Sequence, residues 1–470
     1  MSRNGKSMLS RSLVVVSNRL PIDETVAADG ATAWRRSNGG LVRALHPVVR
    51  DEAAVWVGWT GALGEPASTM LEMEGLRMHS VPMSAEDHAD YYEGFANATL
   101  WPLYHDAVEQ PVYHRRWWEA YHRLNQRFAD VTARVADRDA VVWVQDYHLQ
   151  LVPAMLRKLR PDLRIGFFMH IPFPPGELFV QLPRRVELIE GLLGADLVGF
   201  QRPGAARNFA WLASHLLDLP TTKRDIPYEG RNVRTGAFPI SIDVEEIEAL
   251  ADRCEARERA RQLRADLGSP DRVVLGVDRL DYIKGIEQRL KAYRELLADG
   301  RIKVPDTVMV QVAVPSRQRE GQYRLLAERI EREVARINGD FGRVGLAAVH
   351  YLHQAIKPAE LTALYLAADV MAVTPLRDGM NLIAKEYVAA RVDGNGALVL
   401  SEFCGAAAEL RQAYQVNPHD LDGMKGTLLR ALEADPVDNR RRMRAMRRHL
   451  HTHDVRRWAH SYLSALAQDH

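Results

Sequence analysis

The chain has 470 residues, more than one hydrophobic core usually supports, so we expect two domains. Lysine and arginine (62) nearly balance aspartate and glutamate (61), and a net charge of +1 argues against nucleic acid or a membrane as the main partner. Two cysteines far apart, Cys254 and Cys404, argue against a disulfide framework and suit a reducing compartment. No apolar run is long enough for a membrane span, and residues 13–16 are too short for a signal peptide, so we expect a cytoplasmic protein.

Polar residues follow the first apolar segments of the chain. Residues 13–16 are typical of a buried strand, and Arg19 comes just after it, where α/β folds place their ligands. Gly39 and Gly40 precede a helical pattern, and paired glycines let the backbone approach a phosphate or sugar, although a plain turn explains them equally well. Residues 55–59 indicate another strand, which ends on Trp59 before a glycine-rich exit.

Aromatic residues concentrate between residues 91 and 128. Most of them are expected in the hydrophobic core. We single out Tyr92 and Trp101, because proteins hold sugars with aromatic faces and hydrogen bonds together.

Two further apolar strands end directly at polar groups. Residues 140–144 precede Asp146, and residues 165–169 precede His170. The ends of neighbouring parallel strands face one crevice, so these two side chains are expected to share a site. A lone histidine there is more often structural, but the equivalent placement of Asp146 favours function.

The pattern changes near residue 240, where a helical run at 245–267 precedes a new strand at 273–277. This indicates a domain boundary. Arg279 and Lys284 follow the new strand beside a glycine, and two cations on such a loop can clamp phosphates, with a solvated loop as the alternative. Arg317 follows a later strand at 308–314.

The most informative stretch is the strand at 369–373 with the turn and helix after it. A strand, a glycine turn and a helix start aim backbone N–H groups and a positive dipole end at one spot, which phosphate commonly occupies. Asp378 lies in the turn, and Glu386 lies too far into the helix to cap it, so its carboxylate is suited to ribose hydroxyls. A capped surface helix is the alternative.

Strands alternate with helices throughout, which predicts two doubly wound parallel-sheet domains of the Rossmann-like α/β class, facing across a cleft. We expect an N-terminal domain at 1–240, a C-terminal domain at 241–450, and a helix at 451–470 that packs back on the first domain. The arginine-rich run at 439–457 favours a solvated amphipathic helix over a nucleic-acid patch.

Taken from the residues alone, the second domain offers cations and a helix start to a diphosphate, while the first offers polar and aromatic groups to a sugar. Arg19 and Arg317 are then additional cations, and they indicate an anionic acceptor, most simply a sugar phosphate.

Eight segments in order, SNRLP, NGGL, GWTG, YYEGFANATLWP, VWVQDYHLQLVP, GFFMHIPFP, VDRLDYIKG and TPLRDGMNLIAKEY, together resemble the trehalose-6-phosphate synthase family of glycosyltransferases (glycosyltransferase family 20). The resemblance runs from about residue 13 to about residue 458. It implies a GT-B architecture and metal-independent transfer of glucose, with retention, from a nucleotide diphosphate glucose to glucose 6-phosphate. We therefore expect that the protein needs no cofactor and that the product is trehalose 6-phosphate.

The resemblance also implies a role for each matching residue. The acceptor phosphate would contact Arg19 and Arg317, and the acceptor sugar Tyr92 and Asp146, with Trp59 close by. The leaving diphosphate would contact Arg279 and Lys284 and be approached by Gly39 and Gly40. The donor would contact Asp378 through its glucose hydroxyls, the backbone of Gly379, Met380, Asn381 and Leu382, and Glu386 through its ribose. His170 and Trp101 would border the reacting anomeric carbon.

The resemblance leaves the donor base, the oligomeric state, the mechanism of retention and two alternative functions open. The donor base is not specified, so both UDP-glucose and GDP-glucose are candidates, and a homo-oligomer is compatible with the sequence. Retention suggests a carboxylate nucleophile, for which Asp146 is the candidate, but the resemblance favours front-face departure. The alternatives are a pseudo-glycosyltransferase that couples cyclitols through nitrogen, or a non-catalytic sugar-phosphate sensor, which would be expected to have lost charged site residues.

Overall fold

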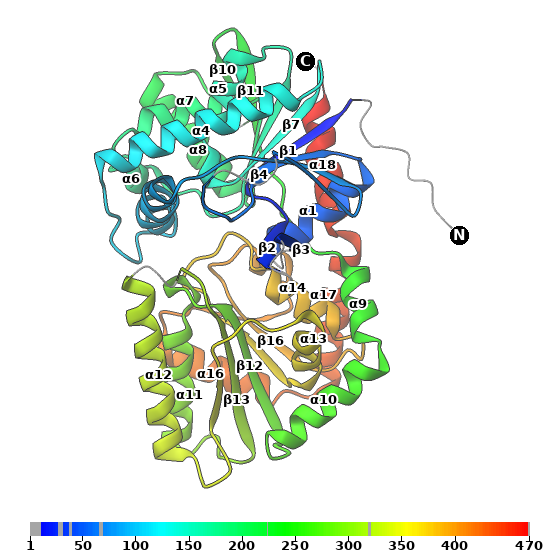
Figure 1. Cartoon of the computed structure of the whole chain (residues 1–470). Coiled ribbons are helices and arrows are strands. Elements are labelled where there is room, and N and C mark those ends of the chain that lie inside the picture. Colours follow the sequence, from blue (N-terminus) through cyan, green and yellow to red (C-terminus); the bar gives the residue numbers. More distant parts are fainter. Residues whose placement is uncertain are drawn as a thin grey trace. The chain divides into compact units, whose positions relative to one another are not determined.

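The computed structural model of the chain describes residues 11–26, 32–36, 40–64, 69–222, 224–317 and 321–468. The chain divides into two compact units (Figure 1). The first unit comprises Met1–Ile240 together with Val455–His470, and the second comprises Ser241–Asp454. Both units are α/β structures built on a parallel sheet, which confirms the predicted fold class.

The first unit contains a nine-stranded sheet in the order β10-β11-β9-β8-β7-β1-β4-β6-β5. Its strands are β1 (Leu13–Arg19), β4 (Val55–Trp59), β5 (Met70–Met73), β6 (Leu76–Ser80), β7 (Val141–Gln145), β8 (Arg164–Met169), β9 (Leu197–Phe200), β10 (Asp225–Tyr228) and β11 (Arg231–Ala237). All pairs are parallel except the edge pairs β5–β6 and β10–β11. The strand order reverses at β1, so ligands are expected at the carboxyl ends of β1 and its neighbours.

Helices flank this sheet, and a separate hairpin pairs β2 (Ile22–Val26) with β3 (Thr32–Arg36) (Figure 1). The helical elements are α1 (Gly40–Asp51), α2 (Ala85–Asp87), the π-helix η1 (His88–Leu100), α3 (Trp101–Tyr104), α4 (Arg115–Val135), the 3-10 turn η2 (Tyr147–Leu149), α5 (Val152–Leu159), α6 (Gly176–Phe179), α7 (Arg185–Leu193), α8 (Pro203–Leu217) and α18 (Val455–Ala467).

The second unit contains a six-stranded, all-parallel sheet in the order β14-β13-β12-β15-β16-β17. Its strands are β12 (Arg272–Arg279), β13 (Thr307–Val314), β14 (Val349–Leu352), β15 (Val370–Val373), β16 (Ala397–Ser401) and β17 (Tyr414–Val416). The order reverses between β12 and β15, which pair directly through Val274–Val370 and Leu275–Met371. The loops after these two strands therefore meet at the switch point of the sheet.

The helical elements of the second unit are α9 (Val244–Ala251), α10 (Cys254–Asp266), the 3-10 turn η3 (Tyr282–Lys284), α11 (Ile286–Ala298), α12 (Gly321–Phe341), α13 (Pro358–Ala367), α14 (Leu382–Ala390), α15 (Ala406–Glu409), α16 (Leu421–Leu432) and α17 (Pro436–Thr452). The single helical run expected at 245–267 is wrong. Arg253 has extended backbone (φ −63°, ψ 136°), which divides the run into α9 and α10.

The C-terminal helix α18 belongs to the first unit and packs through Tyr462. Its hydroxyl donates to the carbonyls of Phe167 (2.9 Å) and Leu197 (3.1 Å). A Cβ at Gly166 or Gly199 would lie 2.6 or 2.5 Å from atoms of Tyr462. The two glycines in β8 and β9 therefore make room for this ring.

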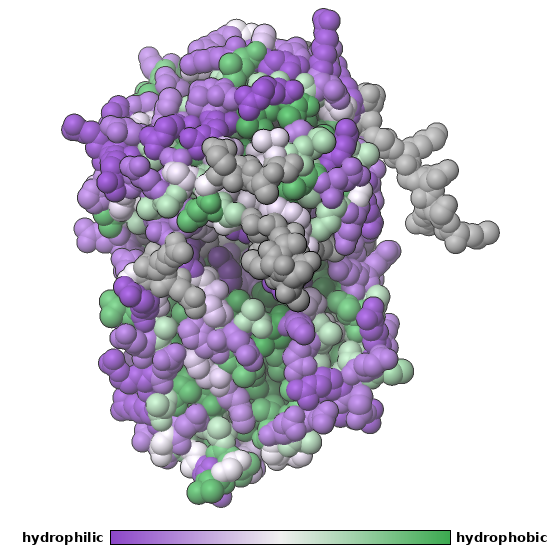
Figure 2. All heavy atoms as spheres, viewed as in Figure 1, coloured by the Kyte–Doolittle hydropathy of each residue, from purple (hydrophilic) through white to green (hydrophobic). Residues whose placement is uncertain are grey.

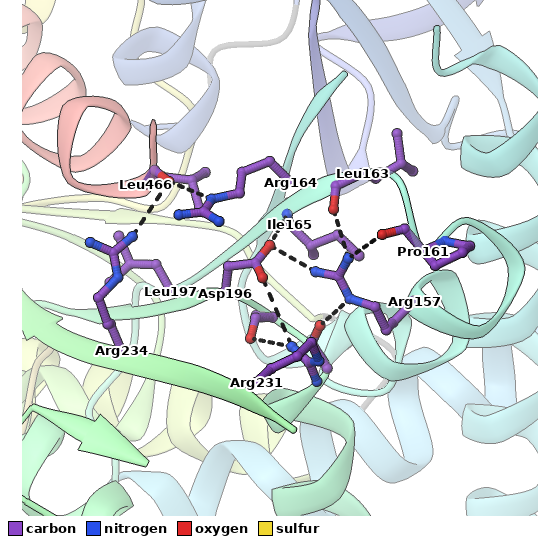
Figure 3. A network of polar contacts seen from close by, with 12 residues as sticks. Arg157, Pro161, Leu163, Arg164, Ile165, Asp196, Leu197, Arg231, Arg234 and Leu466 are labelled. Atoms are coloured by element: carbon purple, nitrogen blue, oxygen red, sulfur yellow. Dashed lines mark hydrogen bonds and ion pairs between the residues drawn. The ribbon is translucent and has the colours of Figure 1, made fainter. Parts of the chain in front are cut away.

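A polar network fixes the end of α18 and the neighbouring strands (Figure 3). Arg164 donates to the carbonyl of Leu466 at 2.7 Å, and Arg234 donates to the same oxygen at 3.5 Å. Asp196 accepts from Arg157 at 2.7 Å and from the backbone N–H of Ile165 at 2.8 Å. Cations beside the last carbonyls of a helix satisfy acceptors that the helix leaves without partners and complement its dipole.

Hydrophilic residues cover most of the face shown in Figure 2, and apolar residues lie scattered among them. Across the described ranges, no helix is both long and apolar enough to cross a membrane.

Candidate functional site

In the second unit, the loops after β12 and β15 bring a lysine and an aspartate together. Lys284 ends η3, and its Nζ lies 2.6 Å from Oδ2 of Asp378, with both side chains mostly buried. Gly285 follows with φ +61°, and a Cβ there would lie 2.1 Å from the carbonyl oxygen of Thr374. Only glycine allows these two loops to approach so closely, and that approach creates the Lys284–Asp378 pair.

The start of α14 lies beside this pair. Asn381 precedes the helix with φ +75°, and its side chain accepts from the N–H of Ala384 at 3.1 Å. Its Nδ2 also donates to Oδ2 of Asp378 at 3.1 Å. Gly379 approaches a second backbone segment, because a Cβ at Gly405 would lie 2.2 Å from its carbonyl oxygen. The segment from Gly379 to Leu382 thus lies at a capped helix start with its positive dipole end.

Glu386 and Lys385 lie in α14, and both are buried. Oε2 of Glu386 accepts from the hydroxyl of Tyr365 at 3.0 Å. Nζ of Lys385 lies 2.8 Å from Oε1 of Glu409, and burial lowers the pKa of this lysine. The two adjacent charges therefore have separate partners.

Two arginines share the carboxylate of Asp281. Arg279, the last residue of β12, has a half-exposed side chain (48%) and lies 4.0 Å from Oδ2 of Asp281. Arg317 lies 3.8 Å from the same oxygen, has a side chain that is only 6% exposed, and donates to the hydroxyl of Tyr323. The second unit thus contains the following predicted site residues: Arg279, Lys284, Arg317, Asp378, the segment from Gly379 to Leu382, and Glu386.

Arg289 is a supporting residue that the sequence analysis missed. It lies on the buried side of α11 with no exposed side chain, and it donates to Asp278 (2.7 Å), Thr374 (3.1 Å) and the carbonyl of Lys284 (3.3 Å). It therefore links β12, β15 and the lysine loop. The sequence does contain a signal for this residue. Arg289 falls at the helical spacing of the apolar residues Ile286 and Leu290, which indicates the buried face of the helix.

In the first unit, Arg19 and Trp59 form a stacked pair. The guanidinium carbon lies 4.9 Å from the centroid of the indole ring, at the carboxyl ends of β1 and β4. Gly61 has φ +96°, and a Cβ there would lie 2.4–2.5 Å from guanidinium atoms of Arg19. A glycine is thus needed to leave space for the arginine head.

An aromatic row continues from Trp59. Its ring centroid lies 5.3 Å from that of His88 and 6.3 Å from that of Tyr92. Tyr92 stacks on His148 at 5.7 Å with an interplanar angle of 8°. The π-helix η1 carries His88 and Tyr92, so its geometry sets the spacing of this row.

Asp146 and His170 follow adjacent strands and contact each other. Asp146 has φ +70° and ψ 171°, a backbone conformation that residues other than glycine seldom adopt. Its Oδ1 accepts from the backbone N–H of His170 at 3.1 Å. Nε2 of His170 lies 2.8 Å from Oε1 of Gln145, and burial lowers the pKa of His170 to about 3, so its imidazole is neutral at pH 7.

Three predicted residues of the first unit remain, namely Trp101, Gly40 and Gly39. Trp101 is buried, with its ring centroid 5.7 Å from that of Tyr147 and 4.2 Å from that of His105. Gly40 is the first residue of α1. Gly39 lies outside the described residues.

Two parallel-sheet units of this kind, with charged side chains at their strand ends, match the architecture of the GT-B class of glycosyltransferases. The chain belongs to glycosyltransferase family 20, whose model matches residues 11–468.

Relatives match over nearly the whole chain. A trehalose-6-phosphate synthase of Mycobacterium avium (strain 104) is 57% identical over 467 residues, which cover 97% of this chain and 95% of the relative. The structure of an alpha,alpha-trehalose-phosphate synthase (UDP-forming) from Burkholderia xenovorans in complex with glucose-6-phosphate is 34% identical, with a TM-score of 0.89 and coverage of 97% and 100%. A structure from E. coli bound with UDP-2-fluoro glucose is also 34% identical, with a TM-score of 0.89 and coverage of 98% and 99%.

Proposed function

We propose that the protein is a trehalose-6-phosphate synthase, which transfers glucose from a nucleotide diphosphate glucose to glucose 6-phosphate and retains the donor's anomeric configuration. The observation that carries this proposal is the 57% identity to synthases over 97% of the chain, with the charged switch-point residues present. UDP-glucose is the first donor to test, because the related solved structures are named for UDP chemistry.

The second unit binds the donor in this proposal. Arg279 and Lys284 contact the diphosphate, and the N–H groups from Gly379 to Leu382 face it at the start of α14. Asp378 binds glucose hydroxyls, and Glu386 binds the ribose. The resemblance to the family also assigns a diphosphate contact to Gly39 and Gly40, which belong to the first unit.

Charge development explains why these groups accelerate the reaction. As the bond between the anomeric carbon and the diphosphate oxygen breaks, negative charge grows on the diphosphate and positive charge grows on the sugar ring. Cations and oriented N–H groups stabilise this separated state more than the ground state. Arg289 holds the lysine loop in place and so preserves the geometry.

In this proposal, the acceptor contacts two arginines together with polar and aromatic side chains. Arg19 and Arg317 bind the phosphate of glucose 6-phosphate. Tyr92, Asp146 and Trp59 contact its sugar, and Tyr92 lies in the same aromatic row as Trp59. His170 and Trp101 border the reacting carbon.

Retention is explained by front-face transfer. The acceptor hydroxyl attacks on the side from which the diphosphate leaves, a new carbon–oxygen bond replaces the broken one, and the hydroxyl proton passes to a leaving phosphate oxygen. Asp146 is the alternative, a nucleophile in a double displacement. In the structure, its carboxylate already accepts a hydrogen bond from His170.

We also propose that the transfer needs no metal, because Arg279, Lys284 and the α14 N-terminus supply positive charge where the diphosphate would lie. A cytoplasmic location is part of the proposal, since both cysteines are free thiols and Cys254 is exposed.

A donor panel tests the proposal. Purified protein is incubated with glucose 6-phosphate and either UDP-glucose or GDP-glucose, with and without EDTA, and trehalose 6-phosphate is quantified. We expect product with at least one donor and no effect of EDTA. Binding of glucose 6-phosphate without turnover would favour a sensor, and product only with a cyclitol acceptor would favour a pseudo-glycosyltransferase.

A further inference from the structure

Gln145 is the last residue of β7, and its side chain is fully buried. Its Oε1 lies 2.8 Å from Nε2 of His170. On the other side, its Nε2 donates to the carbonyl oxygen of Trp143 at 3.4 Å. The amide therefore lies between a carbonyl and an imidazole ring.

The carbonyl of Trp143 determines which way the amide points. A reversed amide would place its oxygen against a second oxygen, so the NH₂ group faces Trp143 and the oxygen faces His170. An amide oxygen only accepts hydrogen bonds. Nε2 of His170 must therefore carry the hydrogen of the pair.

The other contacts of His170 do not compete for this hydrogen. Asp146 accepts from the backbone N–H of His170, and the rings of Phe168 and Trp458 flank the imidazole at 4.7 and 6.0 Å. Within the part of the chain that the structure describes, Gln145 is the one hydrogen-bond partner of the ring. Burial keeps the pKa of His170 low, so the ring is neutral and only one nitrogen is protonated.

We propose that Gln145 is a positioning residue that fixes His170 as the neutral Nε2–H tautomer and leaves Nδ1 as an acceptor for a hydroxyl group of the bound sugar. The tautomer follows from the hydrogen-bond geometry, whereas the sugar contact rests on the proposed function. This tautomer also affects specificity, because the imidazole of His170 can then accept a hydrogen bond from the ligand but donate none to it.

The tautomer is measured by nitrogen NMR on the ligand-free full chain labelled with ¹⁵N-histidine. The chain has 17 histidines, and the difference from a His170→Asn variant assigns the signals of His170. We expect the Nε2–H tautomer in at least about tenfold excess, because the opposite tautomer leaves two buried acceptors facing each other. An Nδ1–H tautomer or comparable populations in the wild-type protein would overturn the proposal.

Two variants test the role of Gln145 itself. Gln145→Met removes the acceptor at similar size and is expected to reduce the excess to less than about threefold, given the size of one buried hydrogen bond. Gln201→Met is the matched control, since Gln201 is also buried at a strand end but its Oε1 accepts from the N–H of Ile240. An unchanged His170 tautomer in folded Gln145→Met would refute the role. Should that variant fail to fold, the wild-type spectrum still decides the tautomer, and Gln145→Glu, which keeps an acceptor, must keep Nε2 protonated.

Ligand addition tests the sugar contact. UDP-glucose is expected to move the Nδ1 signal of His170, whereas UDP, which lacks the glucose, is expected to leave it in place. If the protein makes trehalose 6-phosphate from UDP-glucose but Nδ1 does not respond, the sugar contact is refuted. If no product forms from any donor, the proposed function fails instead, and the ligand-free tautomer is unaffected by that result.

Discussion

Replacement of Gly61 by alanine tests whether the position of Arg19 determines acceptor binding. The new Cβ would lie 2.4–2.5 Å from three guanidinium atoms of Arg19, closer than any real carbon contact. The arginine head must therefore leave its place 4.9 Å above the ring of Trp59. We expect the KM for glucose 6-phosphate to rise while the KM for the donor stays close to the wild-type value.

The expected size follows from two separate costs. A charge-assisted hydrogen bond to phosphate contributes about 1.5–3 kcal/mol, so its loss raises KM by roughly 10- to 150-fold. Alanine at φ +96° also strains the backbone, which lowers the free energy of unfolding by about 1–3 kcal/mol whether or not Arg19 moves.

Gly64→Ala separates these costs. Gly64 has φ +101°, close to that of Gly61, but a Cβ there would meet no atom of the described residues within 4 Å. Both variants should therefore lose similar stability in thermal unfolding, and only Gly61→Ala should lose acceptor affinity in initial-rate assays at saturating donor. Equal KM values in the two variants would refute the claim that Gly61 acts through Arg19.

Three further changes test the other groups. Lys284→Ala should lower kcat by more than about tenfold, because it removes a donor to the leaving diphosphate, and unchanged turnover in steady-state assays would remove that role. Arg317→Ala should raise the KM for glucose 6-phosphate by about tenfold or more at nearly constant donor affinity; a weaker donor affinity in titrations would reassign it to the donor subsite. Asp146→Gly and Asp146→Ala should both reduce kcat/KM. The free energy of unfolding should be about 1–3 kcal/mol higher for the glycine variant than for the alanine variant, since glycine tolerates φ +70°. Equal stability of the two variants by calorimetry would contradict backbone strain at this position.

Strand ends were the part of the site that could be predicted from the sequence. A run of apolar residues predicts a buried strand, and the polar residue after it must lie at the carboxyl edge of the sheet, which located Arg19, Asp146 and Arg279. This inference needs only local pattern and the rule for parallel sheets. The fold class was predicted for the same reason and is confirmed.

Contacts between distant segments could not be predicted in this way. The sequence places Asp281 in the loop after a strand and does not indicate its partners. Its carboxylate lies near both Arg279, which ends one strand, and Arg317, which follows another. Gly61 looked like an ordinary glycine-rich exit, because its partner, Arg19, lies on another strand. The requirement for glycine at 61 is set by a side chain 42 positions earlier in the sequence, and no local pattern carries it.

Under the proposed function, the pairing of Lys284 with Asp378 holds a buried lysine in a fixed position before the diphosphate binds. An ammonium has three N–H donors, and the 2.6 Å contact with Asp378 uses one of them. The carboxylate offsets the cost of burying the cation and fixes its direction, so the remaining donors need little reorganisation when charge develops on the ligand. Because the pair has no net charge, we expect the half-exposed Arg279 and the start of α14 to contribute more to long-range attraction of the anion. Under the proposed function the two cations therefore have different roles: we expect Arg279 to attract the diphosphate and Lys284 to stabilise it as it leaves.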